Sequence, residues 1–125
     1  MSRIYVAELV NEYAAYLVDT YGIRHEFTNQ DMQDWFSEHY PERYKDSACP
    51  QPTDYCYNLV NIKDDKNWRP NKDWHPVFEY VERGIFRPLG KNFAYNGNVF
   101  AKPRSVEEKF QVGYWENGQF YGIPY

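Results

Sequence analysis

The chain has 125 residues, of which 42% are hydrophobic and 20% aromatic, so disorder is excluded and a single domain over residues 1–125 is expected. Its net charge of −4 argues against nucleic-acid binding through bulk positive charge. The charge is uneven, because residues 1–60 carry four basic and ten acidic side chains, whereas residues 61–125 carry ten basic and eight acidic ones.

Two amphipathic helices are predicted first. The first spans residues 4–21 and ends at Gly22, a residue type common just after a helix. The second follows Thr28, a good N-cap with Asp31 three residues later, and ends at Pro41. Apolar residues recur at spacings of three and four along the first helix: Val6, Val10, Tyr13, Ala14, Leu17 and Tyr21. In the second, Met32, Trp35, Phe36 and Tyr40 make the predicted buried face.

A third helix is predicted from Pro52 to Ile62, because Pro suits the first helical position. Its core side would carry Cys56, Leu59 and Val60, and its outer side Asp54, Tyr57, Asn58 and Asn61. Residues 63–75 are charged and rich in turn formers, and they indicate a loop.

Strands and turns are predicted for the rest of the chain. Residues 77–81 and 85–89 indicate a hairpin around Gly84, which supplies the positive φ of a tight turn. Asn96-Gly97 predicts a second hairpin, with strands at 93–95 and 99–101, and Asn117-Gly118 predicts a third. A short helix or irregular piece is expected over residues 105–112. Pro88 favours an edge position for its strand, because Pro donates no ladder hydrogen bond.

Three helices followed by a hairpin are the layout of a winged helix-turn-helix, so the predicted fold is α+β, a winged helix with an extra β-hairpin region at 91–125. Residues 4–90 also resemble the small winged-helix domains attached to restriction and HNH endonucleases. The matching motifs are Tyr40-Pro41, Val77-Phe78, Gly84 and Phe86-Arg87-Pro88-Leu89. The resemblance implies a fold and a DNA-facing surface, and it carries over no catalytic residue.

The first functional hypothesis is a non-enzymatic module that binds double-stranded DNA. Tyr57, Asn58 and Asn61 would face base edges, because Asn can pair with adenine in the major groove. The phosphates would be held by Lys66, Arg69, Lys72, Arg83 and Arg87. In the competing interpretation of this region, Trp68 and Trp74 anchor the loop on the core and its Lys side chains are simply solvated.

The second hypothesis is a protein-interaction inhibitor or adaptor on the same scaffold, for example a phage or mobile-element protein acting against a host nuclease. The acidic first half would face a basic protein partner, since opposite potentials speed association. The tyrosine-rich C-terminal segment would add contact area. Exposed hairpin edges would also allow a homodimer.

No set of residues indicates catalysis, a metal or a cofactor. Cys49, Cys56, His39 and His75 lack a usual zinc spacing, and no nuclease core, nucleophile elbow or phosphate-binding loop occurs. We therefore expect no enzyme and no cofactor. Without a signal peptide or a membrane-spanning run, a cytoplasmic protein with free thiols is expected.

Overall fold

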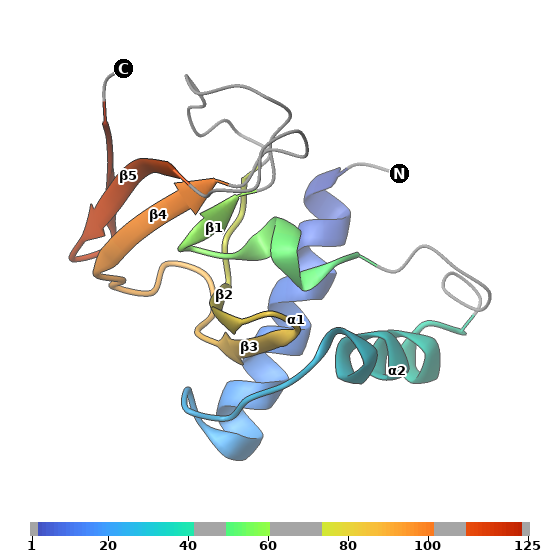
Figure 1. Cartoon of the computed structure of the whole chain (residues 1–125). Helices are drawn as coiled ribbons and strands as arrows, with labels where there is room; N and C mark the ends of the chain where they lie inside the picture. Colours follow the sequence, from blue (N-terminus) through green and yellow to red (C-terminus); the bar gives the residue numbers. More distant parts are fainter. Residues whose placement is uncertain (1–2, 42–49, 61–73, 102–109, 124–125) are drawn as a thin grey trace.

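The computed structural model describes residues 3–41, 50–60, 74–101 and 110–123. In Figure 1 the four-stranded sheet and helix α2 lie at opposite ends, with helix α1 and the β2–β3 hairpin between them. The elements are α1 (Arg3–Tyr21), α2 (Asn29–His39), the 3-10 helix η1 (Pro52–Tyr55), β1 (Leu59–Val60), β2 (Phe78–Glu82), β3 (Ile85–Pro88), β4 (Gly97–Ala101), β5 (Phe110–Glu116) and β6 (Gln119–Gly122).

Both predicted helices are confirmed, together with the signals that bound them. Gly22 ends α1 with a φ of +91°, and its amide donates to the carbonyl of Val18 at 2.9 Å. Thr28 and Asp31 form a reciprocal capping box at the start of α2. Of the predicted core positions of α1, Val10, Tyr13, Ala14 and Leu17 are buried, Val6 is partly buried, and Tyr21 is 56% exposed.

The predicted third helix is wrong. Only η1 forms there, and the chain then enters the two-residue strand β1. Hydrogen bonds to distant segments replace the helical ones: the Tyr57 amide donates to the Phe78 carbonyl at 2.8 Å, and the Phe100 amide donates to the Asn58 carbonyl at 3.0 Å. Pro52 therefore begins only a single helical turn. The backbone after that turn forms hydrogen bonds with distant segments instead of continuing the helix.

The β2–β3 hairpin is confirmed, with Gly84 at a φ of +82° in its turn. An antiparallel bridge between Phe27 and Phe86 ties the segment before α2 to β3. Pro88 stands opposite Phe78 in the two-stranded sheet, and among the described residues the outer side of β3 carries a single bridge, the one at Phe86. Such a position near a strand edge suits a residue without an amide hydrogen.

The second sheet has the strand order β1-β4-β5-β6, with β1 parallel to β4 and the other pairs antiparallel. The hairpin predicted around Asn96-Gly97 is wrong, since residues 93–96 form no strand and Gly97 opens β4. The hairpin at Asn117-Gly118 is confirmed as the β5–β6 turn, in which both residues have a positive φ. Of the piece expected over 105–112, residues 105–109 lie outside the described residues and 110–112 belong to β5.

The winged helix-turn-helix assignment is therefore corrected. The described residues hold two α-helices and six strands, and the third helix that such a fold needs is replaced by η1 and β1. The coarser class stands: the chain has an α+β fold whose C-terminal part is rich in strands. No helix in the described part of the chain is both long and apolar enough to cross a membrane.

Two hydrophobic cores lie side by side along the molecule. The larger one joins α1, α2 and the hairpin, and Tyr13 stands at its centre within 5.2–6.3 Å of the rings of Phe27, Trp35, Phe36 and Phe78. The smaller one lies on the four-stranded sheet and contains Val60, Val99, Ala101 and Val112, with Trp74, Trp115 and Phe120 packed against it.

Candidate functional site

Tyr57, one of the residues predicted to contact DNA bases, is buried between the two cores. Its hydroxyl donates to the Gly90 carbonyl at 2.6 Å and accepts from the Phe93 amide at 3.0 Å. Burial raises the pKa of the Tyr57 hydroxyl, and the hydrogen bond from the Phe93 amide partly offsets that rise. Tyr57 is therefore a structural residue that holds the turn after β3, and it leaves no exposed edge for a base.

Asn58 is held in the same way. Its side-chain amide donates to the Tyr80 carbonyl at 2.9 Å, and its side-chain oxygen accepts from the Tyr80 amide at 2.8 Å. Both hydrogen-bonding groups that would read adenine are thus paired with the backbone of β2. The side chain links the segment before β1 to the hairpin and stabilises the junction of the two sheets.

The predicted phosphate-binding residues are only partly placed. Arg83 is exposed in the turn of the β2–β3 hairpin. Arg87 forms ion pairs with Glu26 at 3.1 Å and Glu79 at 3.6 Å, so its charge is matched within the chain. Asn61, Lys66, Arg69 and Lys72 lie outside the described residues. The described members of the predicted DNA site therefore do not share one exposed surface.

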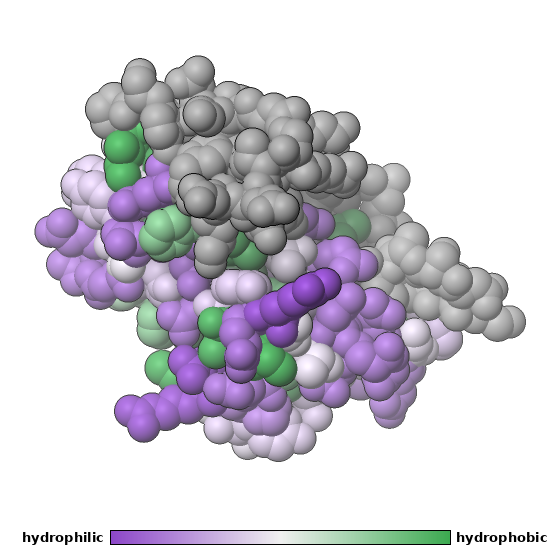
Figure 2. Space-filling model, in the orientation of Figure 1, coloured by the Kyte–Doolittle hydropathy of each residue, from purple (hydrophilic) through white to green (hydrophobic). Residues whose placement is uncertain are grey.

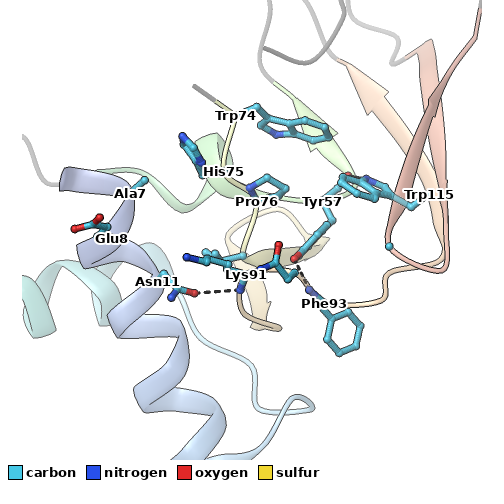
Figure 3. A pocket seen from close by; sticks show the side chains of 13 residues that line it. Ala7, Glu8, Asn11, Tyr57, Trp74, His75, Pro76, Lys91, Phe93 and Trp115 are labelled. Atoms are coloured by element: carbon cyan, nitrogen blue, oxygen red, sulfur yellow. Dashed lines mark hydrogen bonds between the residues drawn. The ribbon is translucent and has the colours of Figure 1, made fainter. Parts of the chain in front are cut away.

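A pocket of about 380 Å³ opens between α1, the segment before β2, the turn after β3 and the β5–β6 hairpin. Figure 3 shows Ala7, Glu8 and Asn11 of α1 on one side and the rings of Trp74, Tyr57 and Trp115 on the other. The ring centroids of Trp74 and Trp115 are 5.5 Å apart, and the two planes are inclined at 43°. Trp115 is fixed in place because its indole nitrogen donates to the Tyr57 carbonyl at 2.8 Å.

Polar groups of both charges line this pocket. Glu8 and Lys91 are exposed at its edge, and the Asn11 side-chain oxygen accepts from the Lys91 amide at 3.1 Å. His75 also lines the pocket, and its Nε2 is buried without a hydrogen-bond partner among the described residues. The arrangement offers aromatic surface beside donors and acceptors, which is the usual composition of a small ligand site.

Sequence reasoning missed most of this pocket. The sequence offers Trp74 as a neighbour of basic residues or as an anchor on the core, and it does pack against the smaller core. It offers His75 only as a metal candidate that lacks a ligand spacing. Glu8, Asn11 and Trp115 gave no signal, because their elements meet only in the folded chain. Across the described ranges, no group of three His, Cys, Asp or Glu side chains could hold a metal ion.

A second feature, the acidic helical face, consists of Glu8, Glu12, Tyr16 and Asp19 of α1 together with Glu38 of α2. Its four α1 residues follow at spacings of four, four and three, so they lie along one exposed side of the helix. Tyr40, just after α2, donates to both carboxylate oxygens of Glu12, at 2.9 and 2.8 Å, which ties the two helices together.

Tyr16 is the aromatic centre of the acidic helical face. It is 42% exposed, and it stacks on Trp35 of α2 at 6.2 Å. The neighbouring Tyr21 raises the pKa of Tyr16, through its charge and a side-chain hydrogen bond, and the negative charge of Glu38 adds to the rise. In the view of Figure 2, hydrophilic side chains predominate at the lower right, where α2 lies in Figure 1.

The fold is α+β, and its pocket has both aromatic and polar walls. The chain belongs to the family described as "Domain of unknown function (DUF7225)", whose model matches residues 7–121. It is similar to the uncharacterized protein YnaC of Bacillus subtilis (strain 168), with 38% identity over 66 residues, which are 53% of this chain and 22% of that protein. The chain thus spans well under two thirds of that relative. No solved structure matches it.

Proposed function

We propose that this chain is a non-enzymatic protein-interaction module that binds a basic partner through the acidic helical face. The observation that carries the proposal is the charge of the two helices. After its first residue, Arg3, helix α1 contains Glu8, Glu12 and Asp19 and no Lys or Arg, and α2 contains Asp31, Asp34 and Glu38 and likewise no Lys or Arg. All six of these carboxylates are exposed.

Such a surface attracts a cationic protein and repels phosphate. Opposite potentials steer two proteins together and raise the association rate, an effect that salt screens over about 10 Å at 0.1 M. A polyanion approaching the same side meets like charge, and Arg24 is the one arginine in the segment that joins the helices. The helical side of the molecule therefore favours a basic protein over DNA.

Tyr16 supplies the apolar contact that charges alone do not give. Exposed tyrosines are enriched at binding hot spots, because a rigid ring buries much area at little entropic cost. The stacking on Trp35 restricts the Tyr16 ring before any partner binds. An aromatic side chain with Glu12, Asp19 and Glu38 around it suits an arginine or lysine of the partner, which can both stack on the ring and pair with carboxylates.

The test is affinity capture with matched charge reversals. The wild-type chain should retain a stoichiometric basic protein, identified by mass spectrometry, and should lose it as salt rises. Asp19→Lys and Tyr16→Ala should each abolish most of that capture. Glu116→Lys reverses one exposed charge at the end of β5, away from the helices, and should leave it intact. Equal losses from Asp19→Lys and Glu116→Lys would mean that only net charge matters, and would refute the acidic helical face.

Nucleic-acid binding is a second candidate, supported by the exposed Arg83 in the hairpin turn. In the sequence, Lys66, Arg69 and Lys72 shortly precede Trp74, a wall of the pocket. Fluorescence anisotropy of duplex DNA at about 50 and 200 mM salt tests this candidate, since phosphate contacts lose orders of magnitude over that range. Arg83→Ala should weaken binding, whereas Arg24→Ala, which removes an exposed arginine between α1 and α2, should not. No binding at low salt would remove the candidate.

A further inference from the structure

We infer that the pocket between α1 and the four-stranded sheet binds one purine or pyrimidine base, carried by a free nucleotide or by an unpaired nucleotide of a single strand. This inference does not rest on the proposed basic partner, because the aromatic walls that carry it lie outside the acidic helical face, with which the pocket shares Glu8 alone. It is drawn from the size of the pocket, its aromatic walls and the chemistry of its polar edge.

The size of the pocket limits the ligand to one compact group. Its volume of about 380 Å³ is near the lower end of the roughly 300–1,000 Å³ that small-molecule sites span. A single ring system enters such a space. A base inside a duplex is covered on both faces by its neighbours, so only an unpaired base can enter.

The walls of the pocket favour a flat ring. Trp74 and Trp115 stand 5.5 Å apart at an angle of 43°, so a ring that stacks on one indole meets the edge of the other. Trp115 cannot swing away easily, because it is hydrogen-bonded to the Tyr57 carbonyl and packed against Phe120 at 5.7 Å. Base–aromatic stacking is tolerant of sequence, because every base has a π face.

The polar edge distinguishes a base from other flat groups. Glu8 offers acceptors, Lys91 offers donors, and the Asn11 amide nitrogen adds donors beside them. The opposite charges of Glu8 and Lys91 balance. The pocket therefore favours a neutral ring that both donates and accepts hydrogen bonds, rather than a carboxylate or an ammonium group. A base edge carries this mixture of donors and acceptors, and Lys91 at the rim also suits the attached phosphate.

The experiment uses the full chain, four ribonucleoside monophosphates (AMP, CMP, GMP and UMP), a mixed-sequence single-stranded DNA oligonucleotide and the corresponding duplex. Binding is followed by calorimetry and by quenching of tryptophan fluorescence. Trp74→Ala should weaken binding about tenfold or more, the change that corresponds to losing one stacked base. Lys91→Ala should weaken it severalfold. Tyr114→Ala removes an exposed aromatic side chain of β5 outside the pocket and should change nothing.

Each outcome of this experiment either supports or overturns the proposed base-binding pocket. Binding of mononucleotides alone supports the pocket with a free nucleotide as its source, and binding of the single strand alone supports it with a nucleic acid as its source. Since Trp74 packs against the smaller core, circular dichroism must show that Trp74→Ala folds; if it does not, the exposed Lys91 decides. No binding of nucleotide or single strand, or binding unchanged in the folded variants, overturns the inference. Duplex bound as tightly as single strand, with both variants unaffected, also overturns it.

Discussion

The helices and the β2–β3 hairpin enclose a core of large aromatic rings, whereas the four-stranded sheet is packed around small aliphatic side chains. Tyr13, Phe27 and Phe78 fill the first core, while Val99, Ala101 and Val112 line the second. The sheet compensates with an outer layer of large rings, since Trp74, Trp115 and Phe120 pack against it. Of these rings, Trp74 and Trp115 also line the pocket, so the region with the smaller core provides its aromatic wall.

The difference indicates which region should govern stability and which should carry the proposed binding. The aromatic core buries more apolar area per residue, and burial stabilises by roughly 25 cal/mol per Å². The face outside it is acidic and bears Tyr16, which suits association. In the sheet region the large rings lie near the surface, where they can contact a ligand. A substitution in each region should therefore affect different properties.

The largest expected effect is the loss of Tyr13 at the centre of the aromatic core. Tyr13→Ala should lower the free energy of unfolding by about 3–5 kcal/mol, because it removes a buried ring that contacts four others. Val99→Ala in the sheet should cost about 2 kcal/mol. Urea unfolding followed by circular dichroism measures both. Equal losses would contradict the distinction between the two cores.

The next largest effect concerns Asn58, whose side chain links the segment before β1 to the β2–β3 hairpin. Asn58→Ala should lower the free energy of unfolding by about 2–3 kcal/mol, because it leaves both the amide and the carbonyl of Tyr80 without the Asn58 side chain. The matched control is Asn98→Ala, which loses one exposed hydrogen bond from Gln111 and should cost no more than about 0.5 kcal/mol. If Asn58→Ala separated unfolding into two transitions, the link would also be the source of cooperativity. A cost as small as that of the control would show that the link is dispensable.

Gly113 provides a test confined to the sheet. An added Cβ there would meet Phe120 Cζ and the Tyr121 carbonyl oxygen, each at 2.5 Å. Gly113→Ala should therefore cost about 1–3 kcal/mol by overpacking, as thermal unfolding would measure. Phe120→Leu in the same chain should recover part of that loss, because it removes the clashing ring atoms of Phe120 and leaves the Tyr121 carbonyl oxygen. Additive losses in the double variant would mean that the clash is relieved elsewhere.

The smallest effect is a pH dependence at Cys56, which is buried beside the hairpin. Burial raises the pKa of the Cys56 thiol, and the charges of Asp54 and Glu79 add to the rise. Above about pH 8.5 the unfolded chain loses this proton and the folded chain keeps it, so the free energy of unfolding should fall as pH rises. Below that pH the contribution is fully present.

The slope from Cys56 cannot exceed about 1.4 kcal/mol per pH unit, the value for one proton. Urea unfolding at several pH values between about 8 and 9.5 measures it, below the range where ordinary tyrosines titrate. Cys56→Ala should remove this pH dependence of the free energy of unfolding, while the variant still unfolds in urea with a measurable transition. Equal slopes for wild type and variant would exclude Cys56 as the cause.

The helices, the first hairpin and the last turn could be predicted from sequence because their signals are local. Thr28 and Asp31 cap the helix that they begin, and Gly84 and Gly118 supply the positive φ that their own turns need. The buried face of α1 followed from the spacing of its apolar residues, apart from the exposed Tyr21 at its end. Neighbouring residues alone fix these features, so no knowledge of the rest of the chain was necessary.

Only the tertiary structure decided the course of the chain after Pro52 and the composition of the pocket. The predicted third helix failed because the amide of Tyr57 and the carbonyl of Asn58 pair with Phe78 and Phe100, residues far away in the sequence. Strand β1 exists because β4 lies parallel to it, and no local pattern indicates such a partner. The pocket joins α1 to β5 for the same reason. The sequence determined where backbone groups are satisfied locally, and the fold decided the rest, because buried amides and carbonyls must find partners wherever the chain brings them.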